Sequence, residues 1–212
     1  CKENTCVFKA INKNSHTMLP TFSILPKKKM THQGGKILFI GNLSWRANIE
    51  GLGWFVDEVL PIIVDSIPEA RLTIVGSGCD HTLFSGYDHV NYLGYVKDIE
   101  PLYSEHQVFV TPLFEGSGIR IKILEAFNHD IPVVSTSKGC GTICAEDGKD
   151  ILISNDEDSF AKSVISLLKS PSKQDNLAHN AKVLLAKGYS ISARVAEFKR
   201  IIEMQTGQRG VL

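Results

Sequence analysis

The stretch that decides the fold is residues 107–135, which read QVFVTPLFEGSGIRIKILEAFNHDIPVVS. An apolar run, residues 107–111, is followed by a Gly-Ser-Gly turn at residues 116–118. Residues 119–129 then show helical spacing, and residues 131–135 form a second apolar run. Short, nearly continuous apolar runs are typical of strands buried on both faces. The stretch therefore predicts a strand, a helix and a second strand parallel to the first.

The same alternation extends in both directions from this unit. Further apolar runs suited to strands occupy residues 37–41, 71–76, 90–94 and 151–153. An amphipathic helix is expected from Leu52 to Ile63, with Pro61 bending its last turns. Two apolar stripes predict helices near the C-terminal end; they contain Phe160, Val164, Leu167 and Leu168, and Val195, Phe198 and Ile202. We therefore expect an α/β fold with a Rossmann-like, doubly wound parallel sheet.

Composition narrows the class of protein. Of 212 residues, 43% are apolar and 22% are charged, which is typical of a soluble globular chain. Lys and Arg number 23, as do Asp and Glu, so we expect no nucleic-acid partner. No apolar run approaches the roughly 20 residues of a transmembrane helix, so we expect no transmembrane segment.

The chain divides into two parts of different composition. Residues 1–34 contain two prolines, the run Lys27-Lys28-Lys29 and no sustained apolar period, so they predict a linker or the tail of a preceding domain. Residues 35–212 would form the Rossmann-like domain. Because the chain opens on Cys1 rather than Met, we expect a piece of a longer protein.

The five cysteines predict thiols in a reducing compartment rather than a disulfide framework or a zinc site. We therefore expect a cytoplasmic protein, either unattached or peripheral at the inner face of the membrane.

In an open doubly wound sheet, ligands bind beyond the carboxyl ends of the strands. Glycine recurs where the predicted strands end, at Gly41, Gly76 and Gly94. Glycine is expected where the backbone turns sharply or approaches a ligand closely. The residues at these strand ends are therefore candidates for a binding site.

The end of the strand at residues 107–111 carries the strongest signal. Gly116-Ser117-Gly118 leads into the helix whose first turns are expected to hold Arg120 and Lys122. Exposed N–H groups at a helix start, its dipole and two cations together favour an anion such as a phosphate. Glu125 lies three residues after Lys122 and could accept hydrogen bonds from ribose hydroxyls. The alternative is a Lys–Glu pair on a solvated helix face, and the glycine turn directly before it favours the binding site.

Other motifs are weaker. Gly76-Ser77-Gly78 begins a dinucleotide fingerprint, but His81 stands at the third glycine position, so we do not expect a nicotinamide site. Asp156-Glu157-Asp158 is interpreted as a helix start rather than a metal site, and no metal site is expected. Trp45 and Trp54 are expected to pack, although Trp45 could line the cleft beside Arg46.

The ordered set of motifs resembles the C-terminal, nucleotide-binding half of family 4 (group 1) glycosyltransferases, which have the GT-B architecture of two facing Rossmann-like domains. The matching segments lie in family order and cover about half the chain; they are residues 37–43, 72–78, 92–98, 116–126 and 131–136. The resemblance implies a nucleotide-diphosphate sugar as donor, linked to UDP or GDP. It further implies no cofactor, no divalent metal and retention of anomeric configuration.

The resemblance also implies roles for particular residues. Glu125 matches the second Glu of the family's E-x7-E motif and would hold the ribose hydroxyls. Arg120, Lys122 and Arg46 would be the catalytic cations that stabilise the leaving diphosphate. The remaining donor-binding positions would be Gly116, Ser117, Gly118, Ile119, Gly41, Asn42, Gly76, Gly94, Tyr95 and Val96.

Two departures from the family pattern bear on these roles. Ser117 stands eight positions before Glu125, where the family usually has a Glu, so either Ser117 or Glu115 could contact the sugar. Asn42 replaces the family's Arg, and its following Lys is replaced near Ala47 and Asn48. The cations Arg46, Arg120 and Lys122 would then compensate for that lost charge.

We therefore expect the donor half of a glycosyltransferase, whose acceptor domain is missing from this chain and whose acceptor is a glycan, lipid or protein. One alternative is that the chain by itself is a non-catalytic nucleotide-binding module. Another is a sugar-nucleotide epimerase of the same architecture, which would form product without an acceptor.

Overall fold

The computed structural model describes residues 19–27, 34–78, 80–84 and 86–206. Within them six strands form one sheet in which every neighbouring pair is parallel. The strands are β1 (Lys36–Ile40), β2 (Arg71–Val75), β3 (Val90–Gly94), β4 (Val108–Thr111), β5 (Val133–Ser135) and β6 (Leu152–Ile153). All six predicted strands are present, so the predicted parallel α/β class is confirmed.

The strand order is β3-β2-β1-β4-β5-β6, the order usual in dinucleotide-binding folds. The chain runs outward from β1 in one direction and from β4 in the other, so the order reverses between these two neighbours. Register pairs Ile37 with Val108 and Leu38 with Phe109. Because ligands bind where the order reverses, the loops after β1 and β4 should flank the site.

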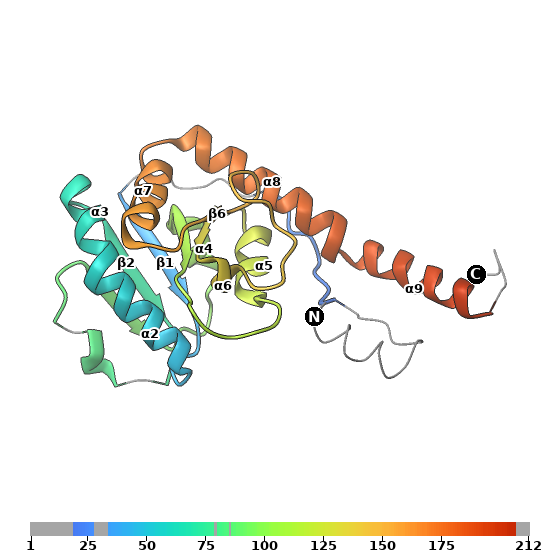
Figure 1. Ribbon diagram of the computed structural model, residues 1–212, viewed down its shortest axis with the longest axis horizontal. Helices are drawn as coiled ribbons and strands as arrows, with labels where there is room; N and C mark the ends of the chain where they lie inside the picture. Colours follow the sequence, from blue (N-terminus) through green and yellow to red (C-terminus); the bar gives the residue numbers. More distant parts are fainter. Residues whose placement is uncertain (1–18, 28–33, 79, 85, 207–212) are drawn as a thin grey trace.

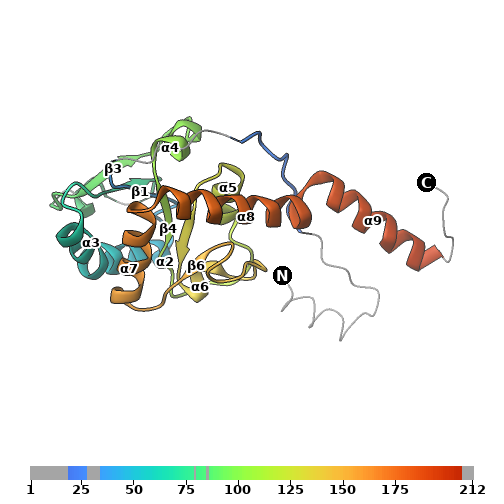
Figure 2. The same ribbon diagram turned by 90° about the horizontal axis from the view of Figure 1, so that it is seen from above.

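Helices cover both faces of the sheet (Figure 1). One face carries α2 (Arg46–Trp54), η1 (Phe55–Val59), α3 (Leu60–Ser66) and α7 (Glu157–Leu168). The other carries α4 (Glu100–Glu105), α5 (Ile121–Asn128) and α6 (Ser137–Cys140). Figure 2 shows α2, α3 and α7 on one side of the strands and α4 and α5 on the other. The short helix η2 (His81–Phe84) connects β2 to β3.

Each face has its own apolar core, because successive residues of a strand point to opposite faces. Ile37 and Phe39 of β1 pack with α2, α3 and α7, whereas Leu38 packs with α4 and α5. All three side chains are fully buried. Burial on both faces explains why the strands are nearly continuous apolar runs rather than alternating ones.

The first helical region differs from the single helix expected from Leu52 to Ile63. It begins six residues earlier, at Arg46, and widens into the π-helical turn η1 before α3 starts at Leu60. Pro61 lies in the first turn of α3, where it has no N–H to donate and its ring crowds the preceding turn. The backbone therefore accommodates Pro61 by a wider turn ahead of it, as π-bulges do elsewhere.

The C-terminal region consists of α8 (Pro171–Tyr189) and α9 (Ile191–Thr206). Helix α8 packs against both α7 and α5, whereas α9 extends away from the sheet (Figures 1 and 2). The predicted last helix is present, but Val195 and Phe198 on its apolar stripe are about half exposed. Among the described residues, none of the helices combines the length and the apolar composition that crossing a membrane requires.

Part of the predicted linker lies along the domain. Phe22 donates its N–H to the carbonyl oxygen of Tyr189 at 2.8 Å. Leu25 donates to Asn128 Oδ1 at 3.0 Å, and Asn128 Nδ2 donates to the Ser23 carbonyl at 2.9 Å. Residues 1–18 and 28–33 of the predicted linker lie outside the described residues, so the boundary at residue 34 stays a prediction.

Candidate functional site

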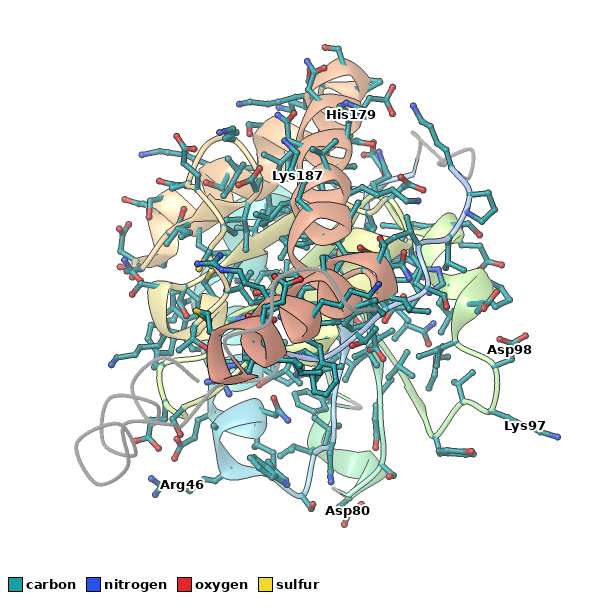
Figure 3. The ribbon with its side chains drawn as sticks, turned by 90° about the vertical axis from the view of Figure 1, so that its right-hand side faces the viewer. Arg46, Asp80, Lys97, Asp98, His179 and Lys187 are labelled. Carbon is teal, nitrogen blue, oxygen red and sulfur yellow. The ribbon has the colours of Figure 1, made fainter. Side chains whose placement is uncertain are left out.

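Hydrogen bonds tie together the loops that follow β1, β2 and β3. The Gly41 N–H donates to the Val75 carbonyl at 2.9 Å, and the Gly76 N–H donates to the Gly94 carbonyl at 2.8 Å. Figure 3 shows Arg46, Asp80, Lys97 and Asp98 along one edge of the molecule, away from His179 and Lys187. This edge, formed by the carboxyl ends of the strands, is where the sequence places the site.

The glycine after β2 serves a contact between loops. Gly76 has a φ of +146°, and a Cβ there would lie 1.8 Å from the carbonyl oxygen of Gly41. A side chain would therefore push the loops after β1 and β2 apart. Both reasons expected for glycine at the strand ends apply at Gly76, because its φ is positive and the backbone of Gly41 approaches it closely.

Arg120 lies just before α5, not in its first turn as expected. Its guanidinium donates to three backbone carbonyl oxygens: Glu115 at 3.1 Å, Ser117 at 3.3 Å and Lys138 at 3.4 Å. These bonds cross-link the loop 112–120 to the start of α6. In this structure Arg120 therefore holds the shape of the glycine turn, and burial lowers its pKa from the usual value.

The start of α5 is open to a ligand. Arg120 occupies the N-cap position without a side-chain hydrogen bond to the helix. The first N–H groups of a helix have no partner within it and carry the positive end of its dipole. Gly118, just before this start, has a φ of +92° and nothing within 4 Å of the position of a Cβ. Backbone N–H groups and open space thus coincide at the start of α5.

Lys122 is partly buried, and its ammonium lies against β1 rather than in bulk water. Nζ sits 4.3 Å from the centroid of the Phe39 ring and donates to Asn48 Oδ1 at 3.0 Å. A Cβ at position 41 would lie 2.6 Å from Nζ, so Gly41 makes room for the cation. The pKa of Lys122 is lowered to about 7, mainly by burial and to a smaller extent by the positive charge of Arg120. The negative charge of Glu125 acts in the opposite direction.

Glu125 lies on the same part of α5 as Lys122 and is half-buried. Burial raises the pKa of its carboxyl group above the ordinary value, while the charge of Lys122 opposes the change. Nearby, the Tyr103 ring stacks on His129, with centroids 4.3 Å apart. His129 is the C-cap residue of α5.

Arg46 and Glu115 are exposed and connect the loops that flank the site. Arg46 Nη2 lies 3.4 Å from Glu115 Oε2, and Arg46 Nε lies 3.4 Å from Glu50 Oε1. Ser117 is exposed in the same loop as Glu115. The two residues considered for sugar contact are therefore both exposed in the loop after β4, and Glu115 is already paired with Arg46 of α2.

The other predicted donor residues also lie at this edge. Asn42 is exposed, and its Oδ1 accepts from the Ser44 N–H at 2.8 Å and the Ser44 hydroxyl at 2.7 Å. Tyr95 is 76% exposed beyond β3, next to the partly buried Val96, while Gly94 is buried with a φ of +65°. Ile119 is partly buried and Gly116 exposed in the glycine turn.

The two tryptophans behave differently. Trp54 packs edge-on against Phe114 and Phe160, at centroid distances of 4.8 and 5.5 Å. Trp45 is 66% exposed at the start of α2, so the expectation that it packs is wrong. Its position directly before Arg46 agrees with the alternative that it lines the cleft.

The acidic motif at residues 156–158 starts a helix. Asp156 accepts from the Ser159 N–H at 2.9 Å and caps α7, and this hydrogen bonding lowers its pKa. Among the described residues, no three His, Cys, Asp or Glu side chains gather in a way that could hold a metal ion. Within the same residues, Cys140 and Cys144 are thiols, and the other three cysteines lie outside them.

Asn48 is the site residue that sequence reasoning missed as a contributor. The sequence marks Asn48 only as part of a region where the family's Lys is absent, yet its side chain contacts Lys122 directly. A signal was present, because Asn48 lies four residues before Leu52 on what proves to be the buried face of α2. A polar residue on an apolar helix face needs a hydrogen-bonding partner, and Lys122 is one such partner.

Comparisons of the sequence identify relatives. Residues 34–170 match the family described as "Glycosyl transferases group 1". An uncharacterized 44.6 kDa protein in the cps region of Klebsiella pneumoniae is 32% identical, over 72% of this chain and 42% of that protein. Spore coat protein SA of Bacillus subtilis is 27% identical, over 66% of this chain and 41% of that protein. The chain thus spans less than half the length of these curated relatives.

Comparisons of the structure agree on the fold. Staphylococcus aureus TarM, solved with UDP, fondaparinux and α-GlcNAc-glycerol, superposes with a TM-score of 0.71 at 18% identity, over 85% of this chain and 38% of that chain. The pneumococcal O-GlcNAc transferase GtfA, solved with UDP and GlcNAc, has a TM-score of 0.62 at 17% identity, over 98% and 44%. The C-terminal domain of LpcC from Francisella tularensis has a TM-score of 0.57 at 14% identity, over 79% and 89%.

Proposed function

Because the chain belongs to the group 1 glycosyltransferases, we propose that it binds the nucleotide-sugar donor of such an enzyme. The binding site would be the edge of the sheet between the loops after β1 and β4. The donor would be a sugar linked to UDP or GDP, and UDP is the first choice because TarM and GtfA were solved with it.

The observation that carries this proposal is the position of Lys122. Its ammonium comes from the second residue of α5, yet it lies against Phe39, near the end of β1, and Asn48 of α2. The cation is thus placed where the strand order reverses, beside the open start of α5. A diphosphate at this position would meet the ammonium and the backbone N–H groups together.

The remaining residues would each contact a different part of the donor. Glu125, near Lys122 on α5, would accept hydrogen bonds from the ribose hydroxyls. Gly94, Tyr95 and Val96 would border the base. The sugar would lie beside the exposed residues Arg46, Glu115 and Ser117. Arg120 would act chiefly by holding the glycine turn in shape.

This arrangement supports a chemical role in glycosyl transfer. When the bond between the sugar and the diphosphate breaks, negative charge develops on the departing phosphate. Fixed cations and helix N–H groups stabilise such charge because they need not reorganise during the reaction. We propose that Lys122 and the start of α5 supply this stabilisation without a divalent metal, and that transfer retains the anomeric configuration. The acceptor, a glycan, lipid or protein, would be bound by a second Rossmann-like domain.

Calorimetric titration of the 212-residue chain with UDP and with GDP, in buffer containing EDTA, tests this proposal. We expect saturable binding of at least one nucleotide, and a loss of affinity of about tenfold or more in Lys122→Met. Lys162→Met, which alters an exposed lysine on α7, serves as the matched control and should bind like the wild type. Equal affinity of the Lys122→Met variant and the wild type would contradict the site.

A further inference from the structure

Asn48 is a buried polar residue on the inner face of α2, with only 8% of its surface exposed. Both ends of its side-chain amide are used. Nδ2 donates to the carbonyl oxygen of Asn42 at 2.6 Å, and Oδ1 accepts from Lys122 Nζ at 3.0 Å. The amide therefore links the loop after β1 to the cation that α5 supplies.

The surroundings leave the lysine little freedom. Its ammonium lies over the face of Phe39, and the missing side chain of Gly41 provides the space it occupies. The Phe39 ring attracts the ammonium, but a cation–π contact does not fix the position of the ammonium over the ring. The hydrogen bond to Asn48 is the directional contact that sets where Nζ sits.

We propose that Asn48 is a positioning residue that holds the Lys122 ammonium at the end of β1 without neutralising it. This inference rests on the proposed function, since it concerns how the cation of the donor site is presented to a diphosphate. An amide orients an ammonium through a neutral oxygen, whereas a carboxylate at the same place forms an ion pair. Asn48 thus leaves the positive charge of Lys122 available to the diphosphate.

The surroundings of Lys122 also set how readily it loses its proton. Arg120 lowers the pKa of Lys122 and Glu125 raises it, while burial lowers it most, to about 7. Lys122 is therefore close to losing its proton at neutral pH in the unliganded chain. A bound diphosphate favours the protonated form, so nucleotide binding above neutral pH should be accompanied by proton uptake.

A double-mutant cycle tests whether Asn48 acts through Lys122. UDP and GDP are titrated into the wild type, Asn48→Ala, Lys122→Met and the double variant, and thermal unfolding confirms that each chain folds. We expect Asn48→Ala to weaken binding about tenfold in the wild type and to have little effect when Met replaces Lys122. Asn91→Ala, at an exposed position on β3, is the matched control and should bind like the wild type.

A second variant separates positioning of the charge from support of the loop. Asn48→Asp places a carboxylate beside Lys122, which raises the pKa of the lysine. Calorimetry at about pH 8 in buffers of different ionisation enthalpy measures proton uptake on binding. We expect uptake approaching one proton per nucleotide in the wild type and much less in Asn48→Asp. Asn91→Asp controls for the added charge and should match the wild type.

The outcomes distinguish this inference from the function on which it rests. If neither nucleotide binds the wild type, or if Lys122→Met binds normally, the proposed site is wrong and the inference falls with it. If Lys122→Met weakens binding but the loss from Asn48→Ala persists unchanged in the double variant, only the role of Asn48 is overturned. Unaltered proton uptake in Asn48→Asp would also overturn that role.

Discussion

Among single residues, the protonation of Lys122 matters most, because it sets the charge that this side chain presents to a diphosphate. Its pKa falls from the ordinary value of 10.5 to about 7 in the folded chain. Between these two values the unfolded chain binds more protons at this residue than the folded chain does. The free energy of unfolding should therefore rise with pH in that range, as far as Lys122 contributes.

The lowered pKa of Lys122 predicts how stability changes with pH. Between about pH 7 and about pH 9, the wild type should gain unfolding free energy relative to Lys122→Met, because only the wild type carries the lysine whose charge is disfavoured by burial. Urea unfolding of both proteins at several pH values measures the difference. Parallel pH profiles would show that the environment of Lys122 does not disfavour its charge.

Glu125 gives a second prediction at this scale, because it is assigned to the ribose and not to the phosphates. Glu125→Gln should weaken binding of UDP or GDP about tenfold and leave binding of inorganic pyrophosphate unchanged or tighter. Lys122→Met should weaken the binding of both kinds of ligand. Competition titrations with pyrophosphate separate the two cases, and an equal loss for pyrophosphate in Glu125→Gln would contradict the ribose assignment.

At the scale of elements, the position of α2 matters because this helix carries both Arg46 and Asn48. A Cβ at Gly51 would lie 1.9 Å from the carbonyl oxygen of Pro112, just after β4. A Cβ at Gly53 of the same helix would have nothing within 4 Å. Gly51 therefore allows α2 to pack closely against the end of β4, whereas Gly53 takes no part in this contact.

The two glycines form a matched pair for a third prediction. Gly51→Ala should lower the free energy of unfolding by about 1–3 kcal/mol, because the helix must move away from β4. Gly53→Ala should raise it by about 0.5–1 kcal/mol, since alanine favours the helix and meets no neighbour. Denaturant unfolding measures both, and effects of the same sign would contradict the packing described for α2.

The elements also show how far the sequence predicts this molecule. All six strands could be predicted, because burial on both faces makes each strand a short apolar run. The early start of α2 and the π-helical turn could not, because residues 46–51 lack a strong apolar period and Pro61 suggests a bend without specifying its form. The sequence does not predict that Arg120 lies outside α5, because one of its partners is the Lys138 carbonyl oxygen, a contact that only the folded loops create.

The sequence predicts where the candidate site lies, but it does not predict all the contacts within it. The glycine turn, Lys122 and Glu125 could be identified from spacing on one segment. The contacts of Lys122 with Phe39 and Asn48 join residues more than 70 positions apart, and they arise only when β1 and β4 lie side by side. Helical spacing along one segment contains no information about such a contact.

At the scale of the whole molecule, the chain covers about two fifths of its curated relatives, and α9 extends away from the sheet. We therefore predict that the 212-residue chain binds a nucleoside diphosphate but does not transfer sugar to an acceptor. Incubation with UDP-sugars or GDP-sugars, with and without candidate acceptors, followed by analysis of the sugars measures this. Transfer by this chain alone would contradict the expectation, and a new sugar formed without acceptor would instead support the epimerase.

The most direct test of the central claim is a crystal structure of the chain with whichever of UDP and GDP binds more tightly. We expect the diphosphate beside Lys122 Nζ and the first N–H groups of α5, with the ribose hydroxyls at Glu125. A nucleotide bound elsewhere, such as in the cavity of about 650 Å³ between Phe22 and Val195, with the loops after β1 and β4 empty, would contradict it.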